Sequence, residues 1–173
     1  MKLSKRGEYA LRALIDLGTA HEAGREMLRV QEIVAKERIP VAFLEQIFVQ
    51  LREAGIVKAK RGKKGGYFLA KPADTISMGQ IVRLIDGPLA PIGCVSQTCY
   101  ERCSCPDEEH CGLRMLMLDV RNSIASILDG YTLAQVIEIT LRKLRRDGLA
   151  IPFALHGECS LGEQDSFVAD YEI

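Results

Sequence analysis

The stretch "VAFLEQIFVQLREAGIVKAKRGKKGGYFLA", residues 41–70, decides the fold. Its first part places Leu44, Ile47, Phe48 and Leu51 at the i, i+3, i+4, i+7 spacing of one helix face, and Gly55 marks the end of that helix. Two short β-type runs follow at 56–60 and 66–70, joined by the basic, glycine-rich turn 61–65. The stretch therefore predicts a helix followed by a β-hairpin.

Upstream residues predict two further helices. Apolar positions recur at helical spacing over 4–18, where Gly18 is expected to stop the first helix, and again over 28–38. Pro40 then opens the helix of the 41–70 stretch. Three helices and a basic hairpin are the order of a winged helix-turn-helix, so we predict a mainly α fold with a small β-hairpin.

The third helix and the hairpin are the predicted DNA contacts. Ala42, Glu45 and Gln46 lie near the N-terminal end of that helix, where recognition helices meet base edges. Arg61, Lys63 and Lys64 sit among glycines in the hairpin turn, which suits contact with a phosphate backbone. The net charge is +6 over residues 1–80 and −6 over 81–173, which agrees with a basic DNA-binding end. A packed domain with a merely solvated basic turn is the alternative.

The second half predicts three more helices around a loop. Ser77 and Gln80 form a capping-box pattern before a helix over 77–87, and Thr132 and Gln135 repeat it before a last helix. Between them lies the loop 88–111, then a long helix that Gly130 closes. The apolar stripe of the long helix comprises Leu113, Leu116, Met117, Val120, Ile124, Ile127 and Leu128. Such a stripe suits pairing with a second copy, since DNA readers of this size usually have two-fold symmetry, although packing on its own domain is the other interpretation.

Five of the six cysteines lie between Cys94 and Cys111. Disulfides, a metal or cluster, and a reactive thiol all compete as explanations. We expect a cytoplasmic protein, which disfavours stable disulfides. The spacing lacks the C-x₂-C pairs of zinc ribbons, so zinc ranks below an iron–sulfur cluster, whose commonest cage is thiolate. Acidic neighbours such as Glu108 do not lower thiol pKa values, which mildly favours metal ligation over a free reactive thiol.

Four segments of the sequence resemble the IscR/NsrR/RirA family of bacterial winged-helix regulators. These are "MKLSKRGEYALRALIDLG", the 41–70 stretch, "SMGQIV" with "IDG", and "TLAQV", and together they extend the resemblance over about residues 1–140. The resemblance implies a homodimer joined by a long helix. It also implies an iron–sulfur cluster on the preceding loop, bound by three cysteines and a variable fourth ligand.

The resemblance also implies site residues. Cys94 and Cys111 match the outer ligands, and the middle ligand is Cys105, then Cys103, then Cys99 in order of preference. The fourth ligand is His110, a further cysteine, or Glu8 of the partner chain. For DNA, Glu45 and Gln46 match base-reading residues and Arg61 matches a minor-groove arginine. Pro40 and Ala42 stand where relatives have hydroxyl residues, and we add Arg6 as a further cationic contact.

We therefore predict a homodimeric, non-enzymatic regulator of transcription that binds a palindromic promoter site in double-stranded DNA. It senses iron, redox state or nitric oxide through a [2Fe-2S] or [4Fe-4S] cluster, with no membrane partner. A zinc-bound or thiol-switched regulator of the same fold, or a cysteine-based electron-transfer protein, are the alternatives. The expected units are the winged helix-turn-helix at 1–87, the cluster loop at 88–111, the dimerisation and C-terminal helices at 112–150, and a flexible acidic tail at 151–173.

Overall fold

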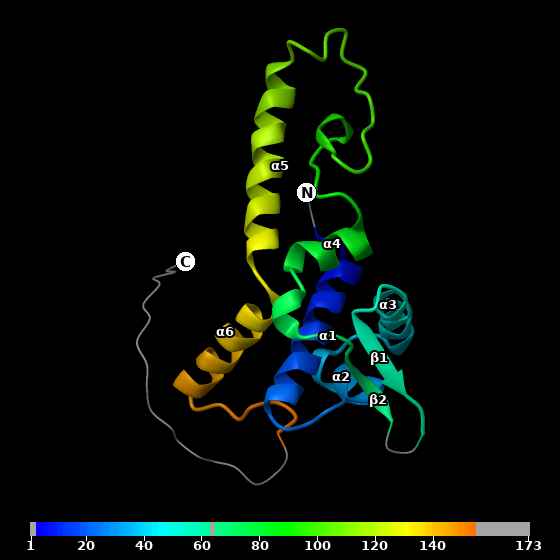
Figure 1. Ribbon diagram of the computed structural model, residues 1–173, viewed down its shortest axis with the longest axis vertical. Coiled ribbons are helices and arrows are strands. Elements are labelled where there is room, and N and C mark those ends of the chain that lie inside the picture. Colours follow the sequence, from blue (N-terminus) through cyan, green and yellow to red (C-terminus); the bar gives the residue numbers. More distant parts are fainter. Residues whose placement is uncertain (1–2, 63–64, 155–173) are drawn as a thin grey trace.

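The computed structural model describes residues 3–62 and 65–154 and shows a winged-helix head with a long helix projecting from it (Figure 1). The head begins with α1 (Lys5–Glu22), α2 (Val30–Glu37), α3 (Val41–Glu53), β1 (Val57–Lys60) and β2 (Gly66–Leu69). It continues through the 3₁₀ turn η1 (Ala73–Thr75) and α4 (Met78–Asp86). The 3₁₀ turn η2 (Gly93–Val95), α5 (Gly112–Gly130) and α6 (Leu133–Arg146) follow. The predicted winged helix-turn-helix order is confirmed.

The prediction that Gly18 ends the first helix is wrong. α1 runs four residues further, to Glu22, and Gly18 lies buried inside it. A Cβ atom at Gly18 would stand 2.0 Å from Cδ1 of Ile137 on α6. The glycine therefore allows α6 to approach α1 closely, so its role is packing rather than helix termination.

The turn between α2 and α3 fixes the direction of the third helix. Arg38 takes a left-handed conformation with φ 54°, which ends α2, and Ile39 is buried in the core. Pro40 is then the N-cap of α3. α3 packs its apolar face inward, and its Phe48 ring stacks on Tyr67 of β2 with centroids 4.1 Å apart. This stack joins the third helix to the hairpin.

The predicted hairpin is present as an antiparallel pair of strands. Val57 pairs with Leu69 and Lys60 with Gly66, one residue short of the expected outer ends of the strands. Gly62 has φ 113°, which an L side chain rarely adopts, and this explains a glycine in the turn. Lys63 and Lys64 lie outside the described residues.

The second half of the chain returns to the head. Ser77 caps α4 by accepting a hydrogen bond from the Gln80 backbone, and Thr132 and Gln135 make both bonds of a capping box at α6. Leu133, Ile137 and Leu141 of α6 belong to the same core as α1. Ile151 and Phe153, which were expected in the tail, pack against that core as well. Among the described residues, none of the helices has both the length and the apolar composition to cross a bilayer.

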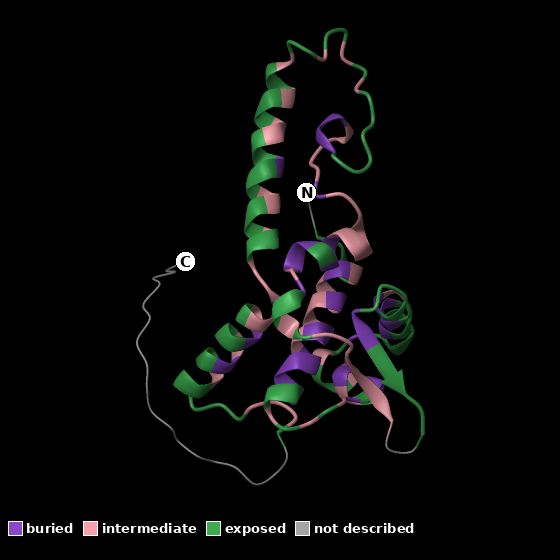
Figure 2. Cartoon of the chain, in the orientation of Figure 1, coloured by how far each residue is buried: buried purple, intermediate pink, exposed green. Residues whose placement is uncertain are grey.

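α5 differs from the other helices because most of it stands clear of the head (Figure 2). Leu113, Leu116, Val120 and Ile127 are all exposed, at 37–61%. At 3.6 residues per turn these four positions fall within an arc of about 60°, so they form one continuous apolar strip, here called the α5 seam. The other members of the predicted stripe, Met117, Ile124 and Leu128, are half-buried.

Candidate functional site

The predicted base-reading residues all lie on the outer surface of α3. Leu44, Ile47, Phe48 and Leu51 are fully buried and turn the opposite face of the helix to solvent. Pro40, Ala42, Glu45 and Gln46 are exposed, the last three on α3 itself. The N-terminal end of α3 is therefore accessible from solvent, and the base contacts of these residues stay a prediction.

The hairpin adds positive charge beside α3. Arg61 is exposed at the turn, and Lys58 and Lys60 are exposed on β1. Lys63 and Lys64, the other predicted contacts in the turn, lie outside the described residues. Arg6 differs from Arg61: it is half-buried, and its enclosed Nε atom donates to no described group. The assignment of Arg6 as a DNA contact stays a prediction.

The loop of residues 88–111 lies beside the N-terminal half of α5, at the end of the molecule away from the hairpin (Figure 1). Cys94 is buried in η2, and Cys111 is the N-cap of α5. Cys103, Cys105 and Cys111 are half-buried neighbours. The sulfur of Cys103 accepts a hydrogen bond of 3.4 Å from the backbone of Cys105. The hydrogen bond between the Cys103 and Cys105 side chains raises the pKa of Cys105 most, and burial and the nearby Cys111 thiol raise it further, to about 11.

Glu108 and Arg114 organise the loop around these thiols. Glu108 accepts hydrogen bonds from the Tyr100 hydroxyl at 2.7 Å and from the Cys103 thiol at 3.7 Å. Arg114, in the first turn of α5, lies 3.3 Å from Glu108 and donates to the Cys94 carbonyl at 3.3 Å. The hydrogen bond from Tyr100 lowers the pKa of Glu108, so the Glu108–Arg114 pair stays charged. Sequence analysis missed both residues, because nothing in their spacing shows that they face each other.

The other predicted ligands stand apart from this group. Cys99 is exposed, and its backbone donates to the Ser96 hydroxyl at 3.0 Å. The His110 Nδ1 atom pairs with Asp107 at 2.8 Å. Glu8 pairs with Lys5 at 2.7 Å and Arg12 at 3.2 Å on α1. Among the described ligand candidates of one chain, therefore, Cys103, Cys105 and Cys111 lie together, and Glu8 would serve only through a partner chain.

The donor set suits an iron–sulfur cluster in its chemistry. Among the described residues, no three His, Cys, Asp or Glu side chains converge tightly enough to enclose a single metal ion. Thiolates of Cys103, Cys105 and Cys111, with Cys94 beside Cys103, are the soft ligands that such a cluster prefers. A cluster is larger than one ion, so it suits a looser group of thiols.

A chain of polar contacts links α5 to the head. Arg83 of α4 donates two hydrogen bonds, of 2.6 and 2.7 Å, to Asp129 near the end of α5. In the same last turn of α4, Asp86 accepts hydrogen bonds from the Ser4 backbone at 2.8 Å and from the Ser4 hydroxyl, just before the start of α1. α4 thus touches both the long helix and the first helix of the head.

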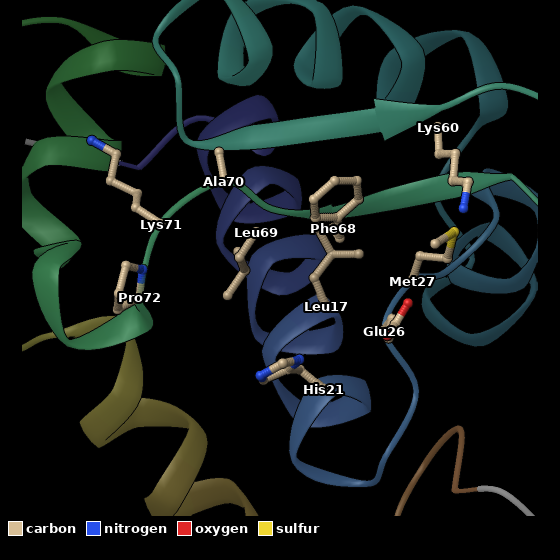
Figure 3. A pocket seen from close by; sticks show the side chains of 10 residues that line it. All are labelled: Leu17, His21, Glu26, Met27, Lys60, Phe68, Leu69, Ala70, Lys71 and Pro72. Atoms are coloured by element: carbon tan, nitrogen blue, oxygen red, sulfur yellow. The ribbon is translucent and has the colours of Figure 1, made fainter.

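A cavity of about 630 Å³ lies between the end of α1 and β2 (Figure 3). Leu17, Phe68 and Leu69 contribute apolar wall, and Lys60 and Lys71 lie at opposite ends of it. No candidate ligand or base-reading residue lines this cavity. The site built by the sequence-predicted residues is therefore a surface and a loop rather than a pocket.

The chain is similar in sequence and in fold to known transcriptional regulators. The Rrf2 family, described as "Iron-dependent Transcriptional regulator", matches residues 3–139. An rrf2-like HTH-type transcriptional regulator of Rhodobacter capsulatus is 38% identical over 139 residues, 78% of this chain and 91% of that protein. The solved structure of CymR, "the Global Cysteine Regulator of B. subtilis", superposes with a TM-score of 0.67 at 30% identity, over 80% of this chain and 98% of that one. T. potens IscR superposes with a TM-score of 0.63 at 27% identity, over 87% and 93% of the two chains.

Proposed function

The chain belongs to the Rrf2 family of transcriptional regulators, and from this premise we propose that it is a homodimer whose DNA binding responds to an iron–sulfur cluster on the loop 88–111. It is a regulator rather than an enzyme, as the family and its relatives are. We place it in the cytoplasm, acting on a palindromic promoter site. The proposed base contacts are Ala42, Glu45 and Gln46, with Arg61 of the hairpin in the minor groove.

One observation carries the cluster proposal: Cys103, Cys105 and Cys111 are neighbours at the N-terminal end of the longest helix. Cys94 is buried beside these three thiols, and Arg114 holds it in place by a hydrogen bond to its backbone carbonyl. The proposed ligands are thus Cys94, Cys105 and Cys111, with Cys103 as the fourth in place of Cys99, His110 or Glu8.

The residues of this chain connect that loop to DNA. When bound, a cluster supplies an iron–sulfide centre that responds to iron supply, oxygen or nitric oxide. Arg114 and Glu108 hold the two sides of the loop against the first turn of α5. Arg83 and Asp129 hold the other end of α5 to α4, and Asp86 holds α4 to the start of α1. When the cluster binds or is lost, the loop becomes more or less ordered. Through these contacts, that change would alter the angle between the two DNA-reading heads of the dimer.

The α5 seam supports the dimer. Four exposed apolar side chains on one face of a projecting helix form a strip that water solvates poorly. A second copy of the same helix provides a complementary apolar strip, and the resulting two-fold symmetry would place two α3 helices on a palindromic site.

A thiol-switched regulator is the second candidate, and the nearby thiols of Cys105 and Cys111 favour it, since Cys103 and Cys105 are too close in sequence for easy pairing with each other. CymR, described as a cysteine regulator, shows that relatives of this fold are linked to sulfur chemistry. The same thiols could also hold zinc. We rank both below the cluster, because the spacing of the loop cysteines lacks the C-x₂-C pairs of zinc ribbons, and because Glu108 beside Cys103 is not a neighbour that activates a free thiol.

Anaerobic reconstitution with iron and sulfide tests the proposal directly. The full chain should bind iron and sulfide in a fixed ratio and absorb visible light, and the ratio assigns [2Fe-2S] or [4Fe-4S]. Cys94→Ala, Cys105→Ala and Cys111→Ala should each abolish the absorption, while Cys159→Ala, outside the loop, serves as the matched control. A colourless protein holding zinc, or one whose loop cysteines form a specific disulfide by mass spectrometry, would support the second candidates instead.

A further inference from the structure

The outward surface of α3 carries several apolar side chains beside its polar ones. Besides Glu45 and Gln46, it exposes Ala42, 50% of Phe43, 42% of Val41 and 40% of Val49. None of these belongs to the buried face formed by Leu44, Ile47, Phe48 and Leu51. A half-exposed phenylalanine therefore stands among the residues that approach the base edges.

The helical positions bring this phenylalanine next to the polar base reader. Ala42 and Gln46 are four residues apart, and Phe43 and Gln46 are three apart, so both apolar side chains are neighbours of Gln46 on the helix surface. Val41 lies about 160° around the helix axis from Phe43, on the opposite flank. The group Ala42, Phe43 and Gln46, here called the α3 tip, is thus two apolar side chains beside one amide.

In the major groove, base-pair edges present hydrogen-bond donors and acceptors, and the thymine methyl group is the apolar exception. Thymine presents a C5-methyl group, and an apolar side chain recognises it, whereas glutamine pairs with adenine through two hydrogen bonds. An apolar side chain placed on any other base edge would leave a donor or acceptor without a partner. The α3 tip therefore matches the chemistry of an A·T-containing half-site.

We propose that Phe43, supported by Ala42, is a specificity-determining residue that contacts a thymine methyl group in each half-site. This inference rests on the proposed role of α3 as the reading helix, and it extends that role by naming the base that the apolar residues select. Gln46 beside it then reads an adjacent adenine, so the half-site carries neighbouring A·T pairs under the helix N-terminus.

Selection from random duplexes with the full chain provides the site for the test, in the cluster state that binds DNA more tightly. We expect a preferred thymine at one position of each half-site for the wild-type protein, and loss of that preference alone in Phe43→Ala. Replacing this thymine by deoxyuridine removes only the methyl group and should weaken wild-type binding about fourfold, the effect of one buried methyl group. Phe43→Ala should bind the two duplexes equally.

Two controls separate a base contact from other effects. Val41→Ala removes a similarly exposed side chain from the opposite flank and should keep the fourfold difference between thymine and deoxyuridine. Phe43→Ala should stay folded at the assay temperature with no more than a small drop in unfolding temperature, because half of the ring is already exposed. Equal weakening by deoxyuridine in wild type and Phe43→Ala would overturn the assignment, as would selected sites with no Phe43-dependent thymine. A wild-type chain that selects no site at all would contradict the DNA-reading role itself, and this assignment with it.

Discussion

Shortening two side chains of the α5 seam should separate the proposed dimer without unfolding either protomer. Leu116 and Ile127 are 56% and 61% exposed, and they lie eleven residues apart, which returns to almost the same face of the helix. Complete burial of such a side chain contributes about 1.5–3 kcal/mol, so burying the exposed part contributes roughly 1 kcal/mol each. Two side chains in each of two protomers then contribute about 4 kcal/mol, equivalent to a thousandfold change in the dimer dissociation constant.

Sedimentation equilibrium measures that change. The wild type should be dimeric at micromolar concentration, and Leu116→Ala/Ile127→Ala should be largely monomeric. The variant should keep the helix content of the wild type in circular dichroism, because both side chains are exposed in the separate protomer. Leu149→Ala is the matched control, because Leu149 is 59% exposed but lies beyond α6, and it should leave the dimer intact. A double variant that remains as dimeric as the wild type would refute the assignment of the seam.

Four further predictions address the head and its link to α5. Arg61→Ala should weaken DNA binding and reduce the slope of log affinity against log salt by about 1, measured by fluorescence anisotropy. An unchanged slope would remove Arg61 from the interface. Gly18→Ala should destabilise the fold by about 1–3 kcal/mol in urea titration, since its Cβ would meet the buried Ile137, whereas Gly130→Ala, with open space around it, should not. Arg83→Ala should change stability by less than about 1 kcal/mol, because the side chains of the Arg83–Asp129 pair are 35% and 45% exposed. It should nevertheless reduce the difference in DNA affinity between cluster-loaded and cluster-free protein. Arg142→Ala removes a surface ion pair on α6 and should leave that difference in affinity unchanged. Burial raises the pKa of Asp16 from 3.8 to about 6, although the Lys36 ammonium opposes the shift. Folding therefore favours the protonated carboxyl, and the stability that this contributes is lost as pH rises through 6. The unfolding free energy of the wild type relative to Asp16→Asn should fall by about 3 kcal/mol between pH 3.5 and 7, and a difference that does not change with pH would contradict this.

The periodic parts of the head were predictable from sequence alone. The spacing of Leu44, Ile47, Phe48 and Leu51 fixes which face of α3 is buried, and the glycines around 61–66 fix the hairpin turn. Both are local properties, because a helix period or a tight turn is encoded within a few neighbouring residues. The exposed seam of α5 is local in the same sense, since its residues recur on one face.

Features that depend on distant neighbours were not predictable in this way. Gly18 has the composition of a helix stop, yet the approach of Ile137, 119 residues away in the chain, gives it a packing role. Nothing in the sequence around Arg114 predicts its partners, and only the folded loop shows that it binds the Cys94 carbonyl and Glu108. The burial of Asp16 beside Lys36 likewise follows from the packing of α1 on α2, which no single-helix pattern contains.

The affinity of the full chain for its selected DNA duplex, measured anaerobically before and after removal of bound iron and sulfide from one preparation, tests the central claim most directly. Coupling between two sites is typically about 1–3 kcal/mol, so we predict a five- to 150-fold difference in dissociation constant between the loaded and stripped dimers. Iron and sulfide analysis should confirm that one sample is fully loaded and the other empty. If the two dimers then bind DNA with the same affinity, the cysteine loop does not control DNA binding, and the account is contradicted.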